Sequence, residues 1–236
     1  MKALNSSLKY FIVQKLTLSN KAAIGLILSG KVLVNGKPGT LSQVLMPEDE
    51  VQLDSEVIKA GRKNVYIAYH KPWGVESTLN TEIENNLVEA LALDETIFPV
   101  GRLDKASEGL MLLTNDGRTL FNILHAEKVQ EKEYLVTVDK PLTPQAIERL
   151  AEGIVIMGQR TRPAVVTQVD ELTFSIVLTQ GLNRQIRRMC YKLGYQVERL
   201  VRTRIITLEL GDLAPGEWRY LHPEELTGLI DRISTS

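Results

Sequence analysis

The chain has 236 residues, with 28 lysines and arginines against 29 aspartates and glutamates, and 44% of its residues are hydrophobic. This composition is typical of a folded globular protein and excludes a disordered or fibrous chain. Its apolar runs are too short for a membrane anchor or a signal sequence, so we expect a cytoplasmic protein that binds no membrane. Cys190 is the one cysteine and the three histidines lie far apart, so neither a disulfide framework nor a metal site is expected.

Residues 1–58 are predicted to form a small helix-helix-strand domain. An apolar periodic run covers Leu4–Leu16, and Ser19-Asn20 is typical of the start of a second helix, which Gly30 then ends. Asn35-Gly36 indicates a hairpin turn between two short strands.

A polar stretch, Asp54–Asn64, is interpreted as a linker, and residues 63–236 as a larger domain. Strand-like apolar runs alternate there with short helical patterns, which predicts an α+β fold with a mixed, largely antiparallel sheet. The predicted strands are Val65–Tyr69, Leu110–Thr114, Tyr134–Val138, Phe174–Leu178 and Ile205–Leu210. Helices are predicted from Thr143-Pro144 to Gly153 and from Asn183 to Gly194.

The net charge of -1 hides two basic regions. Residues 1–47 hold six lysines, Lys21 and Lys31 among them, and no acid, while residues 181–204 hold seven basic residues and one glutamate. Two basic regions suit a polyanion held at two places. The alternative interpretation is ordinary solvated surface charge.

The helix at residues 183–193 is predicted to have one cationic and one apolar face. At 100° per residue, the cationic face holds Arg184, Arg187, Arg188 and Tyr191. Arginines this close repel one another, so a nearby anion, either a carboxylate or a phosphate, is expected to compensate them. A surface helix with distant salt bridges remains the alternative.

Two further segments could carry chemistry. The turn between Gly101 and Gly109 places Asp104 ahead of an apolar strand, where cationic neighbours can keep a carboxylate ionised at the edge of a cleft. An aspartate that only caps the turn is the alternative. Tyr134 lies on the more apolar face of its strand, where it is either a core residue or a ring that stacks on a planar base.

These three segments read GRLDKASEGLMLLTNDG, EKEYLVTVDKP and GLNRQIRRMCYKLGYQVERLVRTRI. Together they closely resemble the pseudouridine synthases of the RsuA family, and within it the RluF-like branch that acts on large-subunit ribosomal RNA. The resemblance runs from Tyr69 to Leu221. Residues 1–58 resemble the small RNA-binding domain of the ribosomal protein S-four type that precedes the catalytic domain in this family.

The resemblance implies an enzyme that isomerises uridine in folded RNA without a metal or nucleotide cofactor. The glycosidic bond breaks, the uracil turns over, and its C5 is joined to the ribose C1′. The implied substrate is large-subunit ribosomal RNA, with transfer RNA as a second candidate, and we expect the enzyme to act as a monomer.

Matching positions imply the roles of single residues. Asp104 corresponds to the catalytic aspartate, acting either as nucleophile or as proton acceptor, and Tyr134 to the tyrosine that packs on the target uracil. Arg187 corresponds to the basic residue that pairs with the aspartate and opposes its protonation. Ile205 is expected to form an aliphatic floor under the uracil, with core packing as an equal alternative. The RNA-binding residues expected besides it are Arg102, which would occupy the vacated base stack, and Lys105, Arg184, Arg188, Lys21 and Lys31.

Two departures from the family pattern stand out. Ser107 replaces a frequent threonine and keeps the hydroxyl, whereas Ser19–Ala23 replaces an arginine-rich helix start and leaves fewer phosphate donors. Two other function classes remain in view. One is a non-catalytic RNA-binding factor for ribosome assembly. The other is a hydrolase that pairs Asp104 with Glu108.

Overall fold

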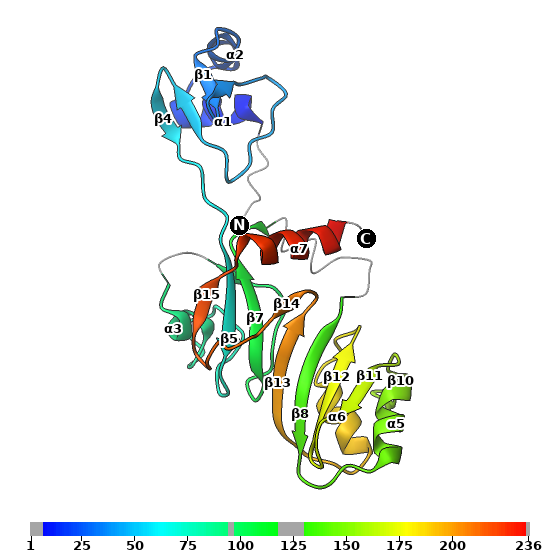
Figure 1. The fold of residues 1–236 in the computed structure, drawn as a ribbon. Coiled ribbons are helices and arrows are strands. Elements are labelled where there is room, and N and C mark those ends of the chain that lie inside the picture. The colour runs from blue at the N-terminus through cyan, green and yellow to red at the C-terminus, as the bar shows by residue number, and fades with distance from the viewer. Residues whose placement is uncertain (1–6, 94–96, 118–129, 235–236) are drawn as a thin grey trace. The chain divides into compact units, whose positions relative to one another are not determined.

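The structure, a computed structural model, describes residues 7–93, 97–117 and 130–234 (Figure 1). The chain divides into two units, Met1–Asn64 and Val65–Ser236. Each unit has its own sheet and its own buried core.

The first unit joins two short helices to a four-stranded sheet in the order β2-β1-β3-β4. Ser7 and Ser19 cap the two helices, because each side-chain oxygen accepts a hydrogen bond from the backbone N–H of the third residue of its helix. Asn35 and Gly36 both have positive φ, as the predicted hairpin turn requires. The elements are α1 (Leu8–Leu16), α2 (Asn20–Leu28), β1 (Val32–Val34), β2 (Lys37–Pro38), β3 (Val51–Leu53) and β4 (Glu56–Lys59). Residues 4–6 of the predicted apolar run lie outside the described residues.

The predicted linker differs from the structure over part of its length. Asp54 and Ser55 have positive φ and turn the chain back, so that β4 pairs antiparallel with β3. β4 is an edge strand with little buried surface, and such strands lack the apolar alternation that marks a strand in a sequence.

The second unit is built on a nine-stranded sheet, which confirms the predicted α+β class with a largely antiparallel sheet. Its main path is β11-β12-β8-β13-β7-β5-β15, where only β13 and β7 run parallel; β6 also pairs with β7, and β14 with β13. The strands are β5 (Tyr66–Lys71), β6 (Phe98–Pro99), β7 (Glu108–Thr114), β8 (Lys132–Val138), β11 (Val165–Gln168), β12 (Thr173–Leu178), β13 (Val197–Ile205), β14 (Leu208–Glu209) and β15 (Trp218–Tyr220).

The helices of the second unit are α3 (Leu87–Leu91), α5 (Pro144–Glu152), α6 (Gln185–Lys192) and α7 (Pro223–Ser234), with a small hairpin of β9 (Val155–Ile156) and β10 (Gln159–Arg160) beside α6 (Figure 1). Thr143 caps α5 and Pro144 opens it, as predicted. Gly153 and Gly194 follow α5 and α6 with positive φ.

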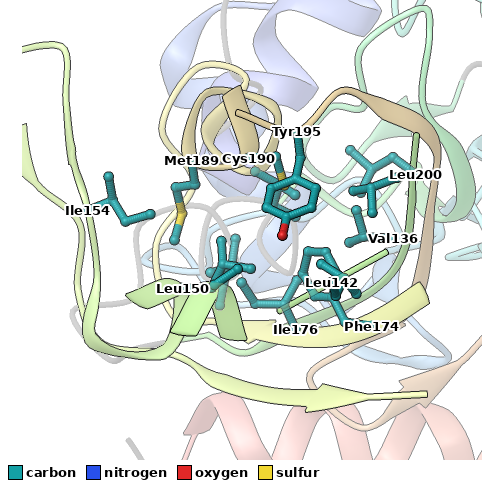
Figure 2. Close-up of a cluster of buried hydrophobic side chains, with 14 of the residues drawn as sticks. Val136, Leu142, Leu150, Ile154, Phe174, Ile176, Met189, Cys190, Tyr195 and Leu200 are labelled. Carbon is teal, nitrogen blue, oxygen red and sulfur yellow. The ribbon is translucent and has the colours of Figure 1, made fainter. Parts of the chain in front are cut away.

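The apolar face of α6 packs on the sheet as its periodicity predicted. Figure 2 shows Met189 and Cys190 on α6 within the same cluster as Leu150 of α5 and Phe174 and Ile176 of β12. All of these side chains are almost fully buried. At about 25 cal/mol per Å² of apolar surface, each buried side chain stabilises the fold by roughly 1.5–3 kcal/mol. This packing fixes the position of α6 over β12 and β13.

The last predicted strand, Ile205–Leu210, is wrong in its bounds. Strand β13 ends at Ile205, Ile206 turns the chain with a φ of 56°, and only Leu208–Glu209 returns as β14. The long strand is instead Val197–Ile205. The three arginines of this strand interrupt its apolar alternation in the sequence. One of them, Arg202, occupies a buried position in the sheet where an apolar residue would be expected.

No single helix in the described ranges is long and apolar enough to cross a membrane. Helices α1 and α2 pass that test of length and composition only as a pair bent by 119°.

Candidate active site

A pocket of about 360 Å³ lies on the face of the large sheet that carries α6. Its lining comes from the turn before β7, from β8, from β13, from the end of β12, from the segment that joins β12 to α6, and from α6 itself. Five of the predicted site residues meet there: Asp104, Tyr134, Arg187, Arg102 and Arg184. Segments far apart in the sequence therefore form one cavity.

The turn that carries Asp104 is held at both ends. The Ser107 N–H donates to the Asp104 carbonyl oxygen at 2.9 Å. The Ser77 hydroxyl accepts from the Leu103 N–H at 3.1 Å and lies 2.7 Å from the Leu103 carbonyl oxygen. Leu103 and Ser107 are buried, whereas 38% of the Asp104 side chain is exposed. The carboxylate thus stands on a rigid turn and opens to the cavity.

Tyr134 enters the same cavity because of the register of the sheet. It lies opposite Ile176 on β12 and opposite Arg202 on β13, and Arg202 in turn lies opposite Gly109 on β7. The ring packs against the two apolar clusters on this face of the sheet. Leu178, Ile186 and Leu200 supply further apolar walls.

The closest cation to Asp104 is Arg184. Its Nη1 lies 3.8 Å from Asp104 Oδ2, and 47% of its side chain is exposed. Arg184 is the N-cap of α6 and adopts the left-handed region with a φ of 49°, without a side-chain cap. The guanidinium that pairs with Asp104 therefore extends from the N-terminus of α6.

Arg187 differs from its predicted arrangement. Its Nη2 donates to the Ala106 carbonyl oxygen at 2.6 Å and its Nη1 to the Val197 carbonyl oxygen at 2.9 Å, so the guanidinium joins the Asp104 turn to β13. Within the described residues the ion pair of Asp104 is with Arg184, and Arg187 forms none. Burial and the charge of Arg184 lower the pKa of Arg187, while Asp104 acts in the opposite direction. The Arg187 Nε is buried without a hydrogen-bond partner.

Two buried cations below the turn were missed by sequence reasoning. Arg202 is 2% exposed; its Nε donates to the Leu110 carbonyl oxygen at 2.7 Å, and its Nη1 lies 3.5 Å from the Arg102 carbonyl oxygen. Lys71 is fully buried, and burial lowers its pKa to about 8. Neither forms an ion pair with any described carboxylate. The available signals were a charged residue among apolar ones for Arg202, and a lysine two residues beyond an apolar run for Lys71.

The remaining predicted residues do not line this pocket. Lys105 is exposed next to Asp104, and its carbonyl oxygen accepts from the Gly74 N–H at 2.9 Å. Arg188 lies one turn along α6 and binds Asn183. Ile205 is 2% exposed within an apolar cluster, so of its two expected roles the structure supports core packing. Lys21 and Lys31 belong to the first unit, where Lys31 pairs with Asp54 at 3.5 Å.

Glu108 is engaged away from Asp104. Both of its oxygens accept hydrogen bonds from Arg199 at 3.1 Å, in a two-pronged ion pair that directs the carboxylate to Arg199. This counts against the paired acid that a hydrolase would need. In the described part of the chain, no group of three or more His, Cys, Asp or Glu side chains is placed to hold a metal ion.

Comparison with known proteins finds consistent similarity. The family model for RNA pseudouridylate synthase matches residues 65–192. Dual-specificity RNA pseudouridine synthase RluF of Escherichia coli (strain K12) is 41% identical over 220 residues, covering 92% of this chain and 76% of the relative. Ribosomal small subunit pseudouridine synthase A of the same strain is 31% identical, covering 93% and 98%. A crystal structure of a pseudouridylate synthase superimposes with a TM-score of 0.65 at 28% identity, covering 94% of this chain and 99% of that one.

Proposed function

Because the chain belongs to the RNA pseudouridylate synthase family, whose members isomerise uridine in RNA, we propose that its reaction takes place in the Asp104 pocket. The observation that carries this assignment is the shared pocket of Asp104, Tyr134 and Arg187, which come from three separate elements. The pocket brings together a carboxylate, a planar ring and a guanidinium held by two hydrogen bonds.

In the proposed reaction the uridine keeps its composition. The bond between N1 and C1′ breaks, the uracil turns, C5 forms the new bond to C1′, and the proton lost from C5 is balanced by a proton gained at N1. Asp104 acts on the ribose or on the base, as nucleophile or as proton acceptor. For either role the carboxylate stands beside a cation, since Arg184 Nη1 lies 3.8 Å from Asp104 Oδ2.

Tyr134 and Arg102 are assigned to holding the nucleotide outside its stack. The Tyr134 ring packs on the uracil, since a half-buried phenol offers one apolar face to a base. Arg102 is exposed at the rim of the pocket and occupies the space that the extruded base leaves. Extrusion costs a few kcal/mol, which such contacts offset. The nucleotide then covers the exposed part of Asp104.

Arg187 is assigned a positioning role for the Asp104 turn in addition to its charge. Its two hydrogen bonds connect α6 and β13 to the residue two positions after Asp104. Arg187 therefore helps to set the distance between the carboxylate and the Tyr134 ring, together with the hydrogen bonds of Ser77 and Ser107.

For the substrate, we assign large-subunit ribosomal RNA, with transfer RNA as a second substrate. The similarity to a dual-specificity enzyme supports this choice. Residues 1–58 serve as an S-four-type RNA-docking domain that uses Lys21 and Lys31, and residues 63–236 carry out the reaction. The protein works as a cytoplasmic monomer, because one chain supplies both parts.

The test is release of tritium from RNA labelled at uridine C5. An in vitro transcript of bacterial large-subunit ribosomal RNA should lose label with the wild-type chain and keep it with Asp104→Asn, which should still bind the transcript. Near-normal release by Asp104→Asn contradicts the assignment of Asp104. Salt-sensitive binding by the wild type without any release would instead indicate the non-catalytic RNA-binding factor.

A further inference from the structure

A second groove, of about 420 Å³, adjoins the pocket along the cationic face of α6. Its far wall is the β9–β10 hairpin, whose turn carries Met157 with a φ of 50°. We call it the α6 groove. Its side chains used below are Arg184, Arg187, Arg188, Lys192, Met157 and Tyr191.

The α6 groove concentrates positive charge, and within the described residues only one of its cations, Arg184, forms an ion pair, with Asp104 of the neighbouring pocket. Four of its lining residues are cations and none is an acid. Arg188 is held only by the neutral Asn183, and within the described residues Lys192 has neither ion pair nor hydrogen bond. Like charges three and four residues apart on a helix destabilise it. The free protein therefore carries an electrostatic cost here that a bound polyanion would relieve.

The α6 groove also exposes large apolar side chains. Tyr191 is 76% exposed and Met157 is 62% exposed, and Tyr191 has no ring contact with another described residue. Cations beside a free aromatic ring are the combination with which proteins bind single-stranded RNA, by phosphate contact and by base stacking. An acidic protein segment would match the charge and leave the ring without a function.

The α6 groove and the Asp104 pocket share Arg184 and Arg187 as a common wall. A strand whose target nucleotide enters the pocket would continue directly into the groove. From Arg184 to Tyr191 the helix rises about 10 Å, which matches about three stacked nucleotides at a rise of about 3.4 Å each.

We propose that the α6 groove binds the RNA strand that flanks the target uridine, with Arg188 and Lys192 on successive phosphates and Tyr191 stacked on a base. This inference rests on the proposed function, since it takes the nucleotide in the Asp104 pocket as its starting point. It assigns to Tyr191, Lys192 and Met157 a surface that holds the strand next to the modified position.

The experiment measures binding of the full chain to a transcript of large-subunit ribosomal RNA at several KCl concentrations. Arg188→Gln and Lys192→Gln should each lower the slope of log affinity against log salt by about one. Tyr191→Leu should weaken binding by about 5- to 100-fold, and Tyr191→Phe should retain wild-type affinity because the ring remains.

Arg149→Gln is the matched control, because Arg149 is an exposed cation on α5 that lines neither cavity. It should leave the slope at the wild-type value. Urea unfolding of every variant separates loss of binding from loss of folding. Polyglutamate, inorganic phosphate and unlabelled transcript serve as competitors, compared at equal concentrations of negative charge. At the concentration where unlabelled transcript displaces the bound RNA, polyglutamate and phosphate should not displace it.

Three results would overturn the proposal: unchanged slopes for both cation variants, equal affinity of Tyr191→Leu and Tyr191→Phe, or displacement by polyglutamate or phosphate as effective as by RNA. Tritium release separates this inference from the proposed function. If the wild type releases tritium but the salt slopes of the groove variants equal that of the wild type, the inference is wrong and the proposed function stands. Slopes that depend on the groove without any release contradict the proposed reaction and leave RNA binding by the groove as the part that stands.

Discussion

The Arg187 guanidinium donates to the carbonyl oxygen of Ala106 at 2.6 Å, two residues beyond Asp104. Its second hydrogen bond, to Val197, anchors the same side chain to β13. The cation thus fixes the backbone next to the carboxylate, while Arg184 supplies the nearer charge.

Arg187→Lys should therefore separate positioning from charge. Lysine keeps the positive charge and loses the two-pronged contact, so we expect the tritium-release rate to fall at least about tenfold at saturating RNA. Stability in urea should fall by about 1.5–3 kcal/mol, the usual value for hydrogen bonds to a charged group. An unchanged rate together with unchanged stability would refute the positioning role.

Gly109→Ala should destabilise the second unit strongly. Gly109 has a φ of 106°, and a Cβ atom there would overlap the backbone of Arg202 on β13. We expect a loss of more than about 3 kcal/mol in urea unfolding. Gly228→Ala in α7 is the control: with only Thr207 Oγ1 nearby at 3.9 Å, it should stabilise the protein by up to about 1 kcal/mol. Equal effects of the two substitutions would contradict this account of the β7–β13 contact.

Lys71 should make stability depend on pH in the alkaline range. Burial lowers its pKa from 10.5 to about 8 in the folded chain. Between these values the unfolded chain binds a proton that the folded chain has released, so the free energy of unfolding gains a positive slope of up to about 1.4 kcal/mol per pH unit. Lys71→Met should be more stable than the wild type below pH 8, and the difference should vanish above pH 10.5. Parallel stability curves for the two proteins would show that Lys71 does not titrate in this way.

Cys190 should report on the opening of the α6 core. The thiol is 1% exposed, and burial raises its pKa to about 12. Because the thiolate is the reactive form, the native protein should resist an aromatic disulfide reagent at pH 8 and react fully in denaturant. Rapid labelling of the native chain would show that the packing in Figure 2 opens readily.

Sequence patterns predicted the elements whose buried faces are regular. Four of the five predicted strands of the larger unit, and the caps of α2 and α5, lie where apolar alternation and capping residues indicated. Strand β13 escaped prediction because Arg202 is buried through hydrogen bonds to backbone carbonyls, and a residue type carries no signal of such tertiary partners.

The site was predictable in its composition and only partly in its contacts. The cationic face of α6 follows from helical periodicity, and the structure brings Arg184, Arg187 and Arg188 together with Tyr191 along one groove. Which arginine lies nearest to Asp104 depends on the left-handed backbone of Arg184, and a non-glycine residue in that region cannot be foreseen from sequence. The burial of Lys71 likewise depends on residues from other parts of the chain, which the sequence around Lys71 does not reveal.

The single run of parallel pairing in the large sheet joins β7 to β13 through only two residue pairs, Val201 with Glu108 and Arg202 with Gly109. Asp104 precedes β7 on one side of this seam, and Tyr134 lies on β8 on the other. The separation of Asp104 and Tyr134 across the cavity therefore depends on this short parallel pairing. A substitution that alters the β7–β13 pairing should therefore change the activity, although it replaces no side chain that contacts the nucleotide.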